Sequence, residues 1–140
     1  MRFFPALITA VLTCATTLAY GQAERFYHSY YDLSEADQLT LDLQGEVVVE
    51  PWASLDQVVV ETRITVERVQ YNFIENLIRQ GRYDIVETTE GFEMTLSTTP
   101  QLRRKMMNRN RELYVERVQF VVYLPEDFEE VRPGVFERTF

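Results

Sequence analysis

The chain has 140 residues, of which 46% are hydrophobic and 26% are charged, and its formal net charge at pH 7 is −8. This length is sufficient for one domain with a buried core. The acidic balance argues against nucleic-acid binding, and against tight binding to anionic lipid, as the main function.

The first 21 residues have the pattern of an export signal. A positive start at Arg2 is followed by a long uncharged run, which ends in small residues at Ala19 and Gly21. This order predicts a secretory signal peptide that is cleaved after Gly21, with an uncleaved membrane anchor as the alternative. We therefore expect a signal peptide at 1–21, a single β-rich domain at 22–140, and a periplasmic or extracellular location.

Few residues offer metal or catalytic chemistry. Cys14 is the single cysteine and lies in the predicted signal, so we expect no disulfide in the exported domain. His28 is the single histidine, and metal sites usually need several such ligands. The acidic stretches Asp32–Asp37 and Glu126–Glu130 lack the residues or spacing of a calcium loop, so we interpret both as turns. We expect no catalytic residue, no cofactor and no metal, and hence no enzyme.

The first half of the domain has the pattern of β-strands. Residues 25–31 form an aromatic-rich strand, and residues 39–43, 46–50 and 57–69 follow with the alternation of a half-buried sheet. Gly45 allows a reversal between the second and third of these strands, although Gln-Gly is a weaker hairpin signal than Asn-Gly.

Residues 71–81 break the strand pattern and predict a short helix that must pack on the sheet. Asn72 and Glu75 have the spacing of a capping pair, and Gly81 is expected to end the helix. A hairpin follows around Glu90-Gly91, and its second strand is expected to bury Phe92, Met94 and Leu96.

A basic loop occupies residues 101–112 of this acidic chain. It contains one glutamate and five cations, which are Arg103, Arg104, Lys105, Arg109 and Arg111. The functional interpretation is an anion-binding patch for phosphate-rich or carboxylate-rich envelope polymers, and the alternative is a mobile, solvated hairpin loop. Nucleic-acid binding conflicts with the export signal, and no interleaved aromatic residues support base stacking.

The last clear strand runs from Leu113 to Pro125, with one hydrophobic face formed by alternate residues from Val118 to Leu124. Leu113 and Val115 have the opposite parity, so we expect a bulge or a change of sheet at Glu116-Arg117. Residues 131–140 are too short to form a further domain.

The order of these motifs resembles the opening of the bacterial "putative adhesin" domain family. The matching residues are Leu41–Gly45, Val47–Val49, Trp52, Val58–Glu61, Ile74–Ile78 and Val121–Pro125. The resemblance covers residues 24–131 and implies an exported protein of unknown function with β-solenoid-like repeats. It assigns no catalytic residues, and the further Gly-x-Val-x-Val rungs that usually follow the Leu-Pro strand in the family do not occur here.

We therefore predict a mainly β protein, with a single sandwich-like or short β-solenoid-like domain of about seven or eight strands and one short α-helix. The expected function is that of an envelope-associated, non-enzymatic module that is adhesin-like or acts as a scaffold. The alternative is a small periplasmic module that binds a lipid or other amphiphile between sheet and helix. Expected partners are a cell-envelope polymer or another envelope protein, together with further copies of the chain through open sheet edges.

Overall fold

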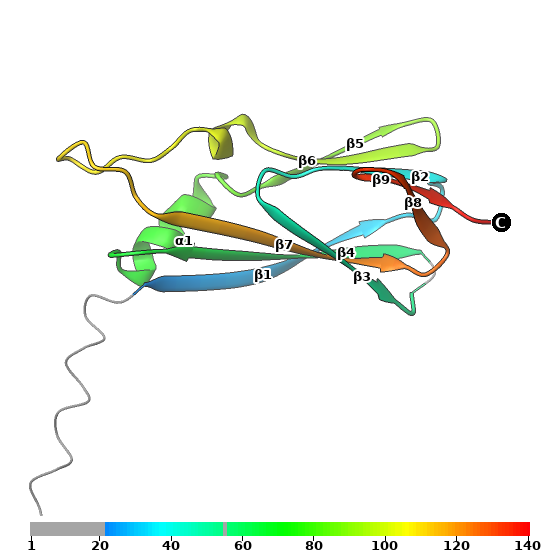
Figure 1. Ribbon diagram of the computed structural model, residues 1–140, viewed down its shortest axis with the longest axis horizontal. Coiled ribbons are helices and arrows are strands. Elements are labelled where there is room, and N and C mark those ends of the chain that lie inside the picture. Colours follow the sequence, from blue (N-terminus) through cyan, green and yellow to red (C-terminus); the bar gives the residue numbers. More distant parts are fainter. Residues whose placement is uncertain (1–21, 55) are drawn as a thin grey trace, which may run out of the picture.

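The computed structural model describes residues 22–54 and 56–140 (Figure 1). The predicted signal peptide and Cys14 lie outside the described residues. Within these described residues, nine strands form two mixed sheets that face each other, and one α-helix lies at one end of the sandwich. The mainly β prediction is therefore confirmed, with a sandwich and slightly more strands than expected.

The two sheets draw their strands from different parts of the sequence. Sheet A has the order β1 (Ala23–Asp32), β4 (Gln57–Val66), β7 (Glu116–Pro125) and β3 (Glu46–Trp52). Sheet B has the order β5 (Ile85–Glu90), β6 (Glu93–Thr98), β2 (Gln38–Asp42), β9 (Val135–Arg138) and β8 (Phe128–Arg132). Neighbouring strands are antiparallel except for the pairs β3–β7 and β2–β6, which are parallel. The helix α1 spans Tyr71–Arg79, and a short 3-10 helix, η2, spans Pro100–Arg103.

The core lies between the sheets and uses the alternation expected from the sequence. On β4 and β7 the inward positions are almost completely buried, and the antiparallel register places Val60 beside Val122 and Ile64 beside Val118. Sheet B closes the core from the other side with Leu39, Met94, Leu96 and Phe136. Burial of these side chains supplies the main stabilisation of the sandwich.

Gly45 carries the chain from one sheet to the other. The strands on its two sides, β2 and β3, belong to different sheets, so they do not form a hairpin. Gly45 has φ +154°, and a Cβ at this position would lie 2.7 Å from the carbonyl oxygen of Val118. Only glycine allows this close passage over β7.

The helix forms where it was predicted but begins differently. Its N-cap is Gln70, without a side-chain cap, so the predicted capping pair is wrong. Asn72 lies inside the first turn, and Glu75 instead pairs with Arg25 on β1 at 2.9 Å. Gly81 follows the helix with φ +79°, as expected. In the described part of the chain, no helix has the length and hydrophobicity needed to cross a membrane.

Two further expectations are corrected at the opposite end of the sandwich. The predicted acidic turn at 126–130 is shorter, because β8 begins at Phe128 and pairs with β9. Phe128 and Phe136 bury their rings in the core, which explains why this hairpin docks. Phe92 does not share the buried face of its strand, since it precedes β6 in the turn and is 67% exposed.

Candidate functional site

The basic loop, residues 101–112, lies at the end of the sandwich that also carries α1 (Figure 1). It links β6 of sheet B to β7 of sheet A, so it is a crossover between sheets and not the hairpin loop of the alternative interpretation. All five predicted contact residues are exposed, namely Arg103, Arg104, Lys105, Arg109 and Arg111. Among the described residues, no ion pair involves any of them.

A buried arginine fixes the base of the loop. Arg82 lies in the turn after α1, and its guanidinium donates to the carbonyl oxygens of Gln101 and Arg104, each at 2.8 Å. The same guanidinium pairs with Glu116 at the start of β7, at 2.7 Å. This carboxylate raises the pKa of Arg82 above its ordinary value. The loop therefore starts from a rigid anchor that joins both sheets.

Tyr83 belongs to the same cluster. Its hydroxyl donates to the carboxylate of Glu116 at 2.5 Å. Burial of the ring, and then the hydrogen bond to Glu116, raise the pKa of Tyr83 above its ordinary value. Glu116 thus accepts from both an arginine and a tyrosine, as the satisfaction of a buried carboxylate requires.

The tip of the loop is held by hydrogen bonds of its own. The side-chain oxygen of Asn108 accepts from the backbone N–H groups of Asn110 and Glu112, at 2.8 and 3.0 Å. Two residues form an antiparallel bridge behind the tip, Met107 and Leu113. The five cations are therefore presented on a backbone that is hydrogen-bonded at both base and tip.

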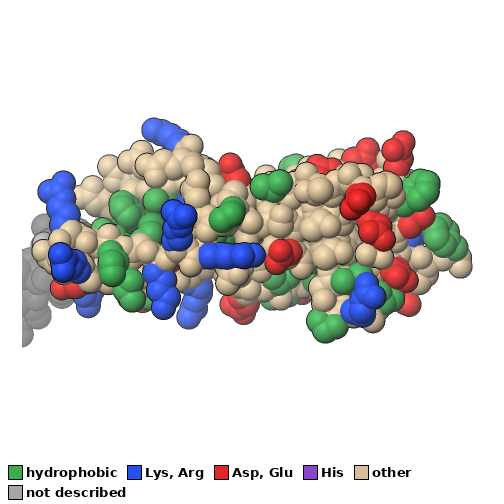
Figure 2. Space-filling view, turned by 90° about the horizontal axis from the view of Figure 1, so that it is seen from above, with side chains coloured by type: hydrophobic (Ala, Val, Ile, Leu, Met, Phe, Trp, Pro, Cys, Tyr) green, Lys and Arg blue, Asp and Glu red, His purple; other side chains and the backbone are tan. Residues whose placement is uncertain are grey.

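Charge is distributed unevenly over the face of the molecule that Figure 2 shows. Figure 2 shows Lys and Arg side chains gathered over the half that carries the basic loop, and Asp and Glu side chains gathered mostly over the opposite half. The acidic end includes exposed carboxylates of β5, β6 and β8, namely Glu87, Glu90, Glu93, Glu129 and Glu130. The chain is therefore negatively charged overall, although one end of the molecule is basic.

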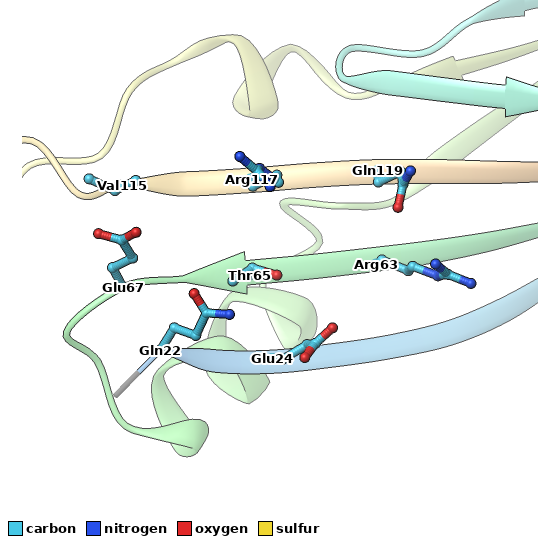
Figure 3. A pocket seen from close by; sticks show the side chains of 8 residues that line it. All are labelled: Gln22, Glu24, Arg63, Thr65, Glu67, Val115, Arg117 and Gln119. Carbon is cyan, nitrogen blue, oxygen red and sulfur yellow. The ribbon is translucent and has the colours of Figure 1, made fainter. Parts of the chain in front are cut away.

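A polar hollow of about 330 Å³ adjoins the loop on the outer face of sheet A (Figure 3). It is lined by Gln22, Glu24, Arg63, Thr65, Glu67, Val115, Arg117 and Gln119. Arg63 is paired with Glu61 at 2.9 Å, whereas Arg117 is exposed and shares the hollow with two exposed carboxylates, Glu24 and Glu67. Because Gln22 lines this hollow, the described chain begins at the basic end of the molecule.

The other residues considered from the sequence are not brought together into a site. His28 lies on the exposed face of β1, with Nε2 3.6 Å from the carboxylate of Glu61. Asp32 accepts the backbone N–H of Ser34 at 2.9 Å, and this hydrogen bond lowers the pKa of Asp32. Within residues 22–54 and 56–140, no three His, Cys, Asp or Glu side chains lie close enough to hold a metal ion.

Sequence reasoning missed the anchor of the loop. Arg82 and Glu116 are separated by 34 positions, and no local pattern relates them. The sequence did mark Glu116 as a special position, because the hydrophobic residues change from odd to even positions there. The strand begins at that residue, so Leu113 and Val115 belong to the loop side and are exposed.

Comparisons with known proteins add little to this geometry. No protein-family model matches the chain, and no curated protein matches it. The chain is similar to a crystal structure of a "putative cell adhesion protein" from Clostridium sporogenes, with 11% sequence identity and a TM-score of 0.41. The similarity covers 74% of this chain and 42% of the other chain, so this chain spans less than half the length of its neighbour. Membership in the adhesin family stays a prediction.

Proposed function

We propose that this chain is an exported, envelope-associated and non-enzymatic interaction module, adhesin-like or a scaffold, that binds a polyanionic envelope polymer through the basic loop. The observation that carries the proposal is the set of five exposed cations, Arg103, Arg104, Lys105, Arg109 and Arg111, on an anchored loop. None of them is neutralised by an ion pair among the described residues.

Electrostatics explains why this arrangement favours an anionic partner. Like charges that are held close together repel one another, and a polymer of phosphates or carboxylates relieves that repulsion while its counterions are released. The acidic end of the molecule repels the same polymer, so the partner is directed to the basic end. We expect the binding to weaken as salt screens these charges.

The alternative function, binding of an amphiphile between sheet and helix, finds no support in the hydrophobic stripe of α1. Of the residues predicted on this face, Ile74 is fully buried and Leu77 and Ile78 pack against the core, whereas Tyr71 is 52% exposed. Packing within the domain therefore accounts for Ile74, Leu77 and Ile78.

The location is part of the proposal and rests on the pattern of residues 1–21. Cell fractionation with an antibody against the domain tests it. We expect the protein in the periplasm or outside the cell, and recovery in the cytoplasm would end the proposal.

Co-sedimentation with purified envelope from the protein's own cells tests the contact site. We expect residues 22–140 to bind at low salt and to bind less at physiological salt. A variant with all five loop cations changed to Ser is expected to lose binding, since each exposed cation near an anionic surface contributes about 1 kcal/mol.

A matched pair of double variants separates the loop from total charge. Arg109→Ser with Arg111→Ser removes two cations from the tip, whereas Arg79→Ser with Arg132→Ser removes two exposed cations elsewhere. The first pair is expected to weaken binding far more than the second. Equal weakening by both pairs would assign the binding to net charge and contradict a site at the loop.

A further inference from the structure

Exposed hydrophobic side chains occur in the basic loop and in the short segment 113–115 that joins it to β7. Met107, Leu113 and Val115 are 59%, 53% and 59% exposed. Large hydrophobic residues that are exposed singly are common, but three in adjoining segments, in and directly after a cationic loop, form a patch. A soluble polyanion would leave this patch uncovered. We call these three residues the apolar strip.

The register of the loop places the apolar strip on one face. Met107 bridges Leu113, and the backbone N–H of Tyr114 donates to the carbonyl oxygen of Met106 at 3.0 Å. In an antiparallel arrangement, alternate residues point to opposite sides. Tyr114 points toward the body, where its ring lies 5.1 Å from that of Phe73. The apolar strip, with the opposite parity, therefore faces away from the body.

Several loop cations lie close to this outward face in the sequence. Arg109 and Arg111 lie at the tip just beyond the Met107–Leu113 bridge, and Lys105 precedes Met107 by two positions. Exposed hydrophobic side chains with Lys and Arg in the neighbouring positions match the boundary of an anionic bilayer. The hydrophobic groups enter the acyl region there, while the cations meet the headgroup phosphates.

Two further observations set the orientation. The acidic end lies opposite the loop, so an anionic surface repels it and attracts the basic end. Gln22, the first described residue, also lies at the basic end. The loop is anchored through Arg82 and organised by Asn108, which reduces the entropy that binding must remove.

We infer that the basic end docks on an anionic lipid bilayer, with the apolar strip at the acyl boundary and the five loop cations at the phosphates. This inference rests on the proposed function, because it uses the same basic loop, and it adds an anionic membrane surface as a second partner beside the envelope polymer. The overall acidity of the sequence argued against anionic lipid as the main partner. The structure separates the charges, so net charge does not describe the surface that docks.

Vesicle flotation tests the inference with residues 22–140, which supply the whole described core. The vesicles contain phosphatidylglycerol with phosphatidylcholine, or phosphatidylcholine alone, and polyphosphate serves as a soluble polyanion. The strip variant carries Met107→Ser, Leu113→Ser and Val115→Ser. Its matched control changes three exposed hydrophobic residues elsewhere, Val86→Ser, Phe92→Ser and Val131→Ser.

We expect the natural sequence to bind anionic vesicles and to bind neutral vesicles far more weakly. The strip variant is expected to lose about a hundredfold in vesicle affinity while it binds polyphosphate unchanged. The variant with the five loop cations changed to Ser is expected to lose both, with vesicle affinity falling on the order of a thousandfold. The matched control is expected to behave like the natural sequence in both assays.

Other results overturn the inference in distinguishable ways. Two results would contradict docking on a bilayer and remain compatible with the proposed function. One is binding of polyphosphate without binding of vesicles, and the other is a strip variant that binds vesicles as tightly as the natural sequence. If the protein binds none of the three, neither polyphosphate nor vesicles nor purified envelope, both the bilayer inference and the proposed function are contradicted. Thermal unfolding of each variant verifies that these exposed substitutions leave the fold intact.

Discussion

At the scale of single residues, the cluster of Arg82, Tyr83 and Glu116 connects stability to the candidate site. Arg82 is 7% exposed, and its guanidinium reaches Glu116 and two carbonyl oxygens of the basic loop. A charge that is buried this deeply is tolerated only when its partners remain in place. The anchoring of the loop and the stability of the domain therefore depend on the same contacts.

Glu116→Gln tests this dependence. It removes the charge that pairs with Arg82, so we expect the free energy of unfolding in urea to fall by about 3 kcal/mol. The control is Glu75→Gln, which breaks the more exposed pair with Arg25 and should cost less than about 1 kcal/mol. Similar losses for the two variants would show that the Arg82 cluster is no more than a surface pair.

The buried tyrosines predict a loss of stability at high pH. Burial raises the pKa of Tyr27 to about 12, from an ordinary value near 10. The folded state keeps this proton at a pH where the unfolded chain has lost it. The contribution of Tyr27 to the free energy of unfolding is therefore complete below about pH 10 and is lost as the pH rises toward about 12. Tyr27→Phe should show a smaller decrease in unfolding free energy over that interval. If the unfolding free energy of Tyr27→Phe decreases as much as that of the natural sequence, the loss of stability at high pH does not come from Tyr27.

At the scale of elements, the C-terminal hairpin shows how a short segment becomes part of the core. Phe128 and Phe136 are 7% and 5% exposed, and Arg138 donates to the carbonyl oxygen of Leu33 and to Asp127. Both hydrophobic burial and hydrogen bonds therefore fix the hairpin to the rest of the domain.

Phe136→Ala should lower the free energy of unfolding by about 3 to 5 kcal/mol, because it leaves a cavity between the sheets. Phe140→Ala is the matched control, since Phe140 is fully exposed. Equal melting temperatures for the two variants would contradict a structural role for β9.

The edges of the sheets differ in how they are protected. β3 carries Pro51, β8 has an irregular register near Glu130, and β5 carries Glu87 and Glu90. The fourth edge strand, β1, has ten residues without a proline or a bulge in its described pairing. We therefore expect two copies to pair through β1.

Light scattering at low and high concentration tests this pairing. The mean mass of the natural sequence should rise with concentration. The rise should be smaller for a variant with Phe26→Lys and Tyr30→Lys, which places charges on the exposed face of β1. A monomer mass at every concentration would count against self-pairing.

The elements and their buried faces could be predicted because alternation and helical spacing are local properties of the chain. The faces of β4 and β7 and the end of α1 at Gly81 are examples. The partner of each strand is not a local property. The step at Gly45 between sheets depends on close passage over Val118, more than seventy residues later. The Arg82–Glu116 pair was missed for the same reason. The five loop cations adjoin in sequence and could be recognised as a basic segment, and their role as a contact site stays a prediction.

At the scale of the whole molecule, the separation of charge is the property that matters for function. The chain is acidic overall, yet its basic loop, Arg117 and the apolar strip all lie at one end, and most exposed carboxylates lie at the other. Such a molecule has a preferred orientation at an anionic surface. The central claim is therefore that the basic end, and not the acidic end, contacts the envelope.

One measurement tests this claim most directly. Residues 22–140 contain no cysteine, so a single cysteine at Asn110→Cys or at Thr89→Cys places an environment-sensitive fluorophore at the basic tip or on β5 at the acidic end. Both positions are exposed and uncharged, so the substitutions remove no charge. On addition of purified envelope, fluorescence is predicted to change at position 110 and to stay constant at position 89. A response at position 89 that equals or exceeds the response at position 110 would contradict the claim.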